Sequence, residues 1–187
     1  MPNITEAKIA ILATDGFEQA ELTVPLAKLK QAGADVHVVS LEAGTIKGWD
    51  KDHWGDTVPV DRVLADVKVA DYDALVLPGG QINPDKLRAE DSAVTFVREF
   101  FNSKKPLAAI CHAPWLLIEA GVIEGRDVTS YKSIKTDVKN AGGNWMDKEV
   151  VVDKGLITSR NPGDLEAFVA KIVEEVQEGP HRQRQAA

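Results

Sequence analysis

The sequence predicts a single α/β domain with a mostly parallel sheet covered by helices on both faces. Two observations predict it: short, continuously apolar runs alternate with longer amphipathic segments, and most of the runs end in turn-forming residues. A strand that is apolar on both sides must be buried on both, which a parallel sheet between two helical layers achieves. At 187 residues the chain is long enough to bury a substantial core. We therefore expect one domain over residues 1–178 and a flexible tail over residues 179–187.

The expected strands are short, and each is bounded by residues that break regular structure. They lie at residues 8–13, 36–40, 74–77 and 107–110, followed by a hairpin formed from residues 149–153 and 156–159. Residues 43–59 contain glycines and tryptophans without a clear period, so we expect a surface excursion or a short hairpin there.

The expected helices lie between these strands. Residues 93–102 and 165–176 place apolar side chains three and four positions apart, which gives each helix one apolar face. Residues 18–32 are also expected to be helical, with Pro25 either kinking the helix or marking its start. Residues 128–140 are expected to join a short strand to a helix.

Bulk properties exclude several classes of protein. The formal net charge is −7 and no basic stripe offsets it, so we expect no nucleic-acid partner. We expect neither a signal peptide nor a membrane span, because no apolar stretch has the required length or flanks. One cysteine cannot form an internal disulfide, which favours a cytoplasmic protein. Metal-ligand spacings and nucleotide-binding fingerprints are absent, so we expect no metal and no cofactor.

The only cysteine, Cys111, lies where a predicted strand meets a predicted helix. Small residues, Ala109 and Ala113, stand two positions on either side, as in a nucleophile elbow that lifts a reactive side chain to the carboxyl edge of a sheet. We expect the sulfur to face the first amides of the following helix, whose partial positive charge favours thiolate. A lone cysteine in an apolar strand is often only a small buried hydrophobe. Here His112 and Pro114 end the strand at the sulfur, which favours a reactive thiol.

Other candidate site residues follow the ends of other predicted strands, so they can meet Cys111 in space. Glu18 would donate a hydrogen bond to sulfur if held protonated, although its spacing alone favours an ordinary carboxylate in a helix's first turn. Gly79 and Gly80 are a weak signal alone, but the amides of Gly80 and His112 are our candidates for holding an oxyanion. His112 is either the base of an unusual site or a capping residue.

Together these motifs resemble the DJ-1/PfpI superfamily, and more closely its bacterial and archaeal PfpI branch. The resemblance covers residues 7–176 and is carried by four stretches in the same order: Asp-Gly-Phe-Glu at 15–18, Leu-Pro-Gly-Gly at 77–80, Ala-Ile-Cys-His-Ala-Pro at 109–114, and residues 137–160, which end in Thr-Ser-Arg.

The resemblance implies a flavodoxin-like three-layer sandwich assembled as a homo-oligomer, either a dimer or a hexamer built from dimers. It implies that Cys111 is the nucleophile, that Glu18 lowers its pKa and that His112 completes the site. In PfpI-type members an acidic residue of the adjacent subunit orients the histidine, and Asp85 aligns with that acid after an insertion. Aspartate is shorter than the glutamate usual there, and Ala113 replaces the more frequent glycine of the elbow.

The activities attributed to this superfamily are peptide hydrolysis, hydration of glyoxals, repair of glycated adducts and protection against oxidative stress. We therefore expect a cofactor-independent cysteine hydrolase acting on small reactive carbonyls (a glyoxalase) or on glycated protein (a deglycase). A cysteine peptidase and a non-enzymatic redox sensor or chaperone are the alternatives, because one thiol serves them all. Catalysis would be favoured by a thiol pKa lowered to about 6, which leaves about 90 % thiolate at pH 7. A glutamine amidotransferase is excluded, since only His181 follows residue 112.

Overall fold

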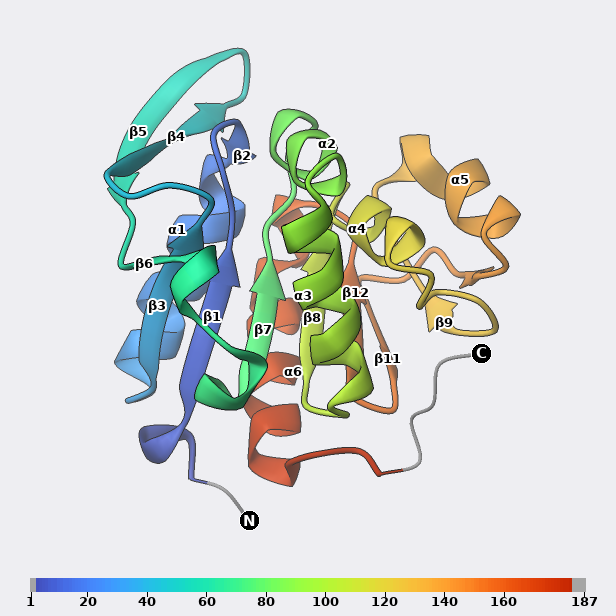
Figure 1. The fold of residues 1–187 in the computed structure, drawn as a ribbon. Coiled ribbons are helices and arrows are strands. Elements are labelled where there is room, and N and C mark those ends of the chain that lie inside the picture. The colour runs from blue at the N-terminus through green and yellow to red at the C-terminus, as the bar shows by residue number, and fades with distance from the viewer. Residues whose placement is uncertain (1–2, 183–187) are drawn as a thin grey trace.

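The computed structural model describes residues 3–182, and its central layer is a seven-stranded sheet (Figure 1). Across the sheet the strands are β11 (Val150–Asp153), β12 (Leu156–Ser159), β8 (Leu107–Ile110), β7 (Ala74–Leu77), β1 (Lys8–Leu12), β3 (Asp35–Ser40) and β6 (Arg62–Val63). Neighbouring strands are parallel except β11 and β12, which form the predicted antiparallel hairpin at one edge. The predicted sheet is therefore confirmed.

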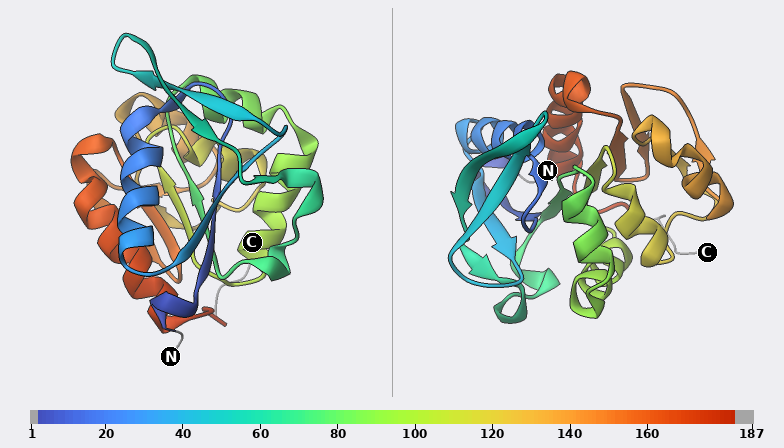
Figure 2. Two further views of the ribbon diagram at one scale, coloured as in Figure 1. Left: turned by 90° about the vertical axis from the view of Figure 1, so that its left-hand side faces the viewer. Right: turned by 90° about the horizontal axis from the view of Figure 1, so that it is seen from above.

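Helices cover both faces of this sheet, which completes the predicted three-layer sandwich (Figure 2). On one face α1 (Gln19–Gln31) packs beside α6 (Leu165–Glu178). On the other face α3 (Asp91–Asn102) and α4 (Pro114–Glu119) pack together, and α2 (Ile82–Arg88) contacts both.

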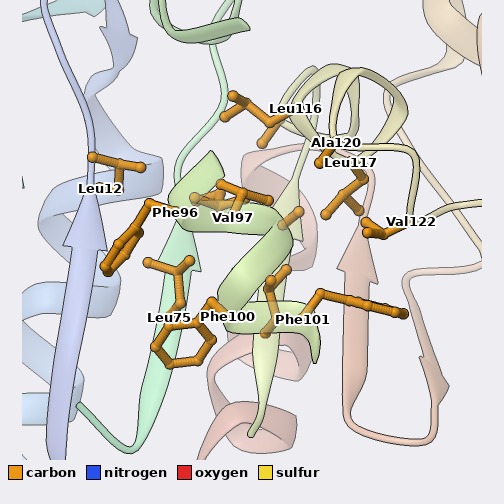
Figure 3. Close-up of a cluster of buried hydrophobic side chains, with 14 of the residues drawn as sticks. Leu12, Leu75, Phe96, Val97, Phe100, Phe101, Leu116, Leu117, Ala120 and Val122 are labelled. Atoms are coloured by element: carbon orange, nitrogen blue, oxygen red, sulfur yellow. The ribbon is translucent and has the colours of Figure 1, made fainter. Parts of the chain in front are cut away.

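Each helical layer has its own apolar cluster against the sheet, because strands buried on both faces supply side chains to both. Figure 3 shows the cluster beneath α3, where Phe96, Val97 and Phe100 lie near Leu12 of β1 and Leu75 of β7. Their burial stabilises the fold by roughly 1.5–3 kcal/mol for each large side chain. This packing fixes the strand ends that carry the site.

The order of the strands creates a switch point between β1 and β7. The chain runs from β1 outward to β3 and β6, then returns to place β7 on the other side of β1. The loops that leave the carboxyl ends of β1 and β7 therefore diverge, which is where open α/β sheets bind ligands. β8 lies next to β7, so Cys111 at its end faces the same crevice.

Residues 43–59, expected to form an excursion or a short hairpin, form a hairpin. Strands β4 (Thr45–Asp50) and β5 (His53–Pro59) pair with each other, and β2 (Phe17–Glu18) pairs with β4. Trp49 and Trp54 pack edge to face with ring centroids 5.4 Å apart, so these tryptophans form a local packing pair.

The helix predicted at residues 18–32 is confirmed, and one further helix was not expected. α1 begins at Gln19 and continues through Pro25, so the proline does not mark its start. α2 was not expected, because the segment after Gly80 has no helical period and contains Pro84, which lies within the first turn where its missing N–H costs little. The expected strand-to-helix unit at 128–140 is present as β9 (Asp127–Val128) and α5 (Lys135–Asn140).

None of the helices within residues 3–182 is long and apolar enough to cross a membrane. Part of the tail predicted for residues 179–187 lies outside the described residues, namely 183–187. Within the described part, the N–H of His181 donates to the Lys104 carbonyl at 2.8 Å.

Candidate active site

A pocket of about 530 Å³ lies over the carboxyl ends of the central strands. Most of its walls come from the segments after β1, β7 and β8, from the β4–β5 hairpin and from the loop before α6. The lining residues are Gly16, Glu18, Glu21, Trp49, Lys51, Gly80, Gln81, Ile82, Cys111, His112, Tyr131 and Pro162. Most of the residues singled out in the sequence, far apart along the chain, thus meet at one place.

Cys111 occupies a sharp turn between β8 and α4, as the elbow pattern predicts. Its φ is +65°, a left-handed conformation that costs a non-glycine residue roughly 1–2 kcal/mol. The turn is held by hydrogen bonds from the Cys111 N–H to the Ser159 carbonyl (3.0 Å) and from the Tyr131 N–H to the Cys111 carbonyl (2.8 Å). The residue is only 5 % exposed, and it lines the pocket.

The start of α4 does not supply free amides to the sulfur, contrary to our expectation. The N–H groups of Ala113, Trp115 and Leu116 donate to carbonyls within the turn, and Pro114 has no N–H. Instead, the backbone amides of Gly80 and His112 hydrogen-bond to Cys111. The two amides that we selected as oxyanion donors therefore face the reactive atom.

The carboxyl group that contacts the sulfur belongs to Glu21. Its side chain is fully buried in α1, interacts with the Cys111 side chain, and accepts a hydrogen bond from the Gly79 N–H at 2.9 Å. A Cβ at Gly79 would overlap both the Glu21 carboxylate and the Cys111 Cβ, so only glycine lets the β7 loop pass between them.

Our assignment of the sulfur-contacting carboxyl to Glu18 is corrected by this geometry. Glu18 ends β2, lines the same pocket and is partly exposed, whereas Glu21 lies three residues further on. Residues at i and i+3 share a helix face, so the buried partner could have been sought at 21. The signal was an acidic residue beside Leu22, on the face that α1 turns toward the core.

The surroundings of Glu21 and Cys111 both raise and lower the pKa values of these two groups. Burial, with the charge of Glu18, raises the pKa of Glu21 to about 8, against the lowering effect of the Gly79 amide and Cys111. Burial and the nearby Glu21 also raise the pKa of the Cys111 thiol, while the amides of Gly80 and His112 lower it. This opposes the expected depression to about 6. Two buried acids in contact cannot both ionise, so near neutral pH the pair carries at most one charge.

The ring of His112 points back toward the sulfur of the preceding residue, Cys111. Nδ1 lies 3.1 Å from Cys111 Sγ, and Nε2 lies 3.1 Å from Ser133 Oγ. The ring stacks on Tyr131 at 4.7 Å and contacts Trp115 edge to face. Burial lowers the pKa of His112 to about 4, so the imidazole is neutral at pH 7. The geometry therefore favours a role for His112 in the site over a role as a capping residue.

Asp85 lies outside the pocket of its own chain. On α2 it forms an ion pair with Arg88, whose guanidinium lies 4.2 Å from the Trp115 ring centroid. Trp115 in turn contacts His112. Asp85 thus has no contact with the histidine within the described chain, and a role across a subunit interface stays a prediction.

One buried residue that the sequence analysis missed holds the site loops together. Asn83 of α2 is fully buried; its Oδ1 accepts from the Thr14 N–H at 2.7 Å, and its Nδ2 donates to the Pro78 and Gly79 carbonyls. It therefore joins the end of β1 to the loop after β7. No spacing rule distinguishes this asparagine from one on the surface.

One group in the described chain has ligand atoms close enough to hold a metal ion, and it is remote from the thiol. Glu175, Glu178 and His181 at the end of α6 have ligand atoms within 4.8 Å of one another. His181 Nε2 and Glu175 Oε2 are 2.6 Å apart, which is accounted for by an ion pair. Sequence spacing did not indicate this group, because the tail brings the histidine back.

Comparison with known proteins agrees with the fold. The DJ-1/PfpI family profile matches residues 7–175. The chain is 50 % identical to Protein/nucleic acid deglycase 2 of Escherichia coli over 86 % of its length and 92 % of that protein. It is 44 % identical to Deglycase PfpI of Pyrococcus furiosus over 89 % of its length and 97 % of that protein.

Solved structures extend the likeness to three dimensions. A two-domain protein of Anabaena variabilis, containing DJ-1/ThiJ/PfpI-like and ferritin-like domains, superposes with a TM-score of 0.87 at 35 % identity, covering 97 % of this chain and 52 % of that one. DJ-1beta of Drosophila melanogaster superposes with a TM-score of 0.82 at 32 % identity, covering 92 % of this chain and 95 % of that one. Matches over nearly the whole chain, together with the strained cysteine elbow, show that this chain belongs to the DJ-1/PfpI family.

Proposed function

We propose that this protein is a cofactor-independent cysteine hydrolase that removes reactive carbonyls from glycated adducts, that is, a deglycase. The observation that carries the proposal is the contact between one buried carboxyl group, Glu21, and the chain's single thiol, Cys111, at the wall of a pocket. The names of the relatives in Escherichia coli and Pyrococcus furiosus support this activity over others of the family.

The reactive form has its proton on Glu21 and its charge on Cys111. The sulfur attacks the carbon that joins the carbonyl compound to the amine; a C–S bond forms, the C–N bond breaks, and the leaving amine takes a proton from Glu21. The hemithioacetal rearranges by proton transfer to a thioester, with the Gly80 and His112 amides holding the developing negative oxygen. Water then releases a hydroxy acid and restores the thiol. Free methylglyoxal enters the same route by addition of the sulfur to its aldehyde.

The test compares wild-type protein with Cys111→Ala on methylglyoxal adducts of N-acetyl-lysine and on methylglyoxal itself. We expect lactate to form with wild type and to be lost in the variant, because no other thiol exists in the chain. A matched control is His53→Ala, since that exposed ring lies outside the pocket lining. Equal lactate formation by wild type and Cys111→Ala would overturn the proposal.

We also propose a homo-oligomer, a dimer or a hexamer of dimers, in which Asp85 of one copy approaches His112 of another. The exposed Asp85 carboxylate and the Arg88–Trp115–His112 chain of contacts support the idea. Peptide hydrolysis, the alternative activity, needs this arrangement. Asp85→Asn should then abolish peptide cleavage without slowing alkylation of Cys111, with the oligomer size checked by light scattering. Unchanged cleavage would remove Asp85 from the site.

Oxidation sensing is the second alternative, supported by the same single thiol. Mild peroxide would add two oxygens to Cys111 alone in a sensor that turns over no carbonyl substrate.

A cytoplasmic location is proposed on the same basis, because a lone reactive thiol without disulfides suits a reducing compartment.

A further inference from the structure

The imidazole of His112 has both ring nitrogens engaged within one chain. Nδ1 lies 3.1 Å from Cys111 Sγ, and Nε2 lies 3.1 Å from Ser133 Oγ. The residue is only 4 % exposed, and its ring is held between Tyr131 and Trp115. Stacking fixes the plane of the ring. Which ring nitrogen faces the sulfur then depends on the hydrogen-bond partner of the other nitrogen, Nε2.

The position of Ser133 is set by the segment that carries it. Ser133 lies in a short 3₁₀ turn, η4 (Lys132–Ile134), between Tyr131 and the core. Tyr131 is tied to the elbow by its N–H bond to the Cys111 carbonyl, and Ile134 is buried at 2 % exposure. Anchors on both sides therefore hold the exposed serine hydroxyl over the ring.

A hydroxyl at this place does what a carboxylate cannot. It can accept from Nε2–H, which leaves the Nδ1 lone pair free to take the thiol proton. It can also donate to Nε2, which leaves Nδ1–H free to donate to a thiolate. A carboxylate would only accept, and it would stabilise the imidazolium. The ionisable groups around the ring are Tyr131, which stacks on it, Cys111 and Glu21 at the elbow, and Glu18 and Lys51 across the pocket, while Asp137 and Arg88 lie beyond Trp115.

We infer that Ser133 is the positioning residue for His112: its hydroxyl aims Nδ1 at Cys111 and permits either neutral tautomer during the reaction. The inference rests on the proposed function for its catalytic consequence. The serine acts from the same chain, in addition to the acid of a neighbouring subunit that the sequence resemblance implies. The neutral ring produced by burial agrees with a partner that carries no charge.

The experiment compares Ser133→Ala, Ser133→Thr and Ser133→Asp with wild type. We expect Ser133→Ala to lower kcat roughly tenfold with little change in KM, and Ser133→Thr, which keeps the hydroxyl, to recover most of the loss. Ser133→Asp should raise the His112 pKa above about 4 and shift the acidic limb of the rate profile, since a carboxylate favours imidazolium. Ser92→Ala, at another exposed serine, serves as the matched control and should behave as wild type.

Two measurements do not depend on turnover. Nitrogen NMR of ¹⁵N-histidine should show a tautomer ratio for His112 that changes in Ser133→Ala, and the rate of Cys111 alkylation against pH should change with it. If no substrate is turned over by wild type, the proposed function fails, while these measurements still decide the role of Ser133. Unaltered nitrogen shifts and alkylation in Ser133→Ala, with thermal stability preserved, would overturn the inference.

Discussion

At the sulfur, two buried acids lie so close together that only one of them can ionise. Glu21 and Cys111 are in contact, and burial raises the pKa of both. The thiolate exists only while Glu21 keeps its proton, because a second negative charge in the same buried space is strongly unfavourable. The pair therefore titrates as a unit rather than as two independent groups.

Glu21→Gln should convert the two-step titration of Cys111 reactivity into a single step. In wild type the pair loses its first proton as the pH rises through the raised Glu21 pKa of about 8 and its second proton only at a higher pH, whereas glutamine has no proton to lose. The measurement is the alkylation rate of Cys111 between pH 5 and 11.

Glu18→Gln is the matched control for this variant, because Glu18 lines the pocket while Glu21 holds the sulfur contact. It should keep both steps. If Glu18→Gln, and not Glu21→Gln, removed one of the two steps, the assignment of the sulfur-contacting carboxyl to Glu21 would be wrong.

At the residue scale, the sequence could identify Cys111 but not its carboxyl partner. A cysteine flanked by alanines at a strand end is visible in one dimension. The choice between Glu18 and Glu21 depends on where β2 ends and α1 begins, a boundary of one residue that propensity does not resolve. Ser133 was not found either, since a serine near a short 3₁₀ turn resembles any surface serine.

Among the secondary-structure elements, the loop after β7 is the one most constrained by its neighbours. Gly80 has a φ of +82°, and a Cβ there would lie 2.6 Å from the Gly16 carbonyl oxygen and 2.7 Å from the Glu18 nitrogen, both backbone atoms. This close approach brings the ends of β1 and β7 together and aims the Gly80 amide at the sulfur.

Gly80→Ala should therefore lower stability by more than the roughly 1–2 kcal/mol of a left-handed alanine, and should reduce turnover at least tenfold. Gly121→Ala is the matched control: its φ is +68°, and a Cβ there meets nothing within 4 Å. It should lose stability but keep activity. Denaturant unfolding and lactate formation measure the two effects. Equal losses in both variants would mean that backbone conformation alone, and not the close approach, matters at Gly80.

At the same scale, buried strands were the easiest elements to predict. β7 and β8 begin and end at the predicted residues, because an apolar run bounded by turn residues has few other solutions. α2 was missed because two of its three buried residues, Asn83 and Pro84, interrupt any apolar stripe. Its position depends on tertiary hydrogen bonds, in which Asn83 accepts from the Thr14 N–H and donates to the Pro78 carbonyl.

For the molecule as a whole, the site has a thermodynamic cost that depends on pH. The folded protein holds the Glu21 proton up to about pH 8, whereas an unfolded glutamate releases it near 4.5. Folding therefore takes up a proton between these values, and stability falls as the pH rises through this window. The loss is on the order of 2–5 kcal/mol for a shift of this size.

Glu21→Gln should lose less stability than wild type when the pH is raised from 5 to 8. Glutamine keeps the shape and cannot ionise in the buried site. Urea unfolding at several pH values measures this, with Glu119→Gln, an exposed residue on α4, as the control that should follow wild type. Parallel curves of unfolding free energy against pH for wild type and Glu21→Gln would show that the buried carboxyl does not lower stability at alkaline pH.

The left-handed backbone of Cys111 restricts which chemistries this scaffold can adopt. A side chain branched at Cβ fits poorly at a φ of +65°, so threonine is excluded there, whereas serine and glycine are compatible with the turn. A family built on this elbow can exchange sulfur for a primary alcohol or abandon the reaction altogether, but it has no route to a secondary-alcohol nucleophile.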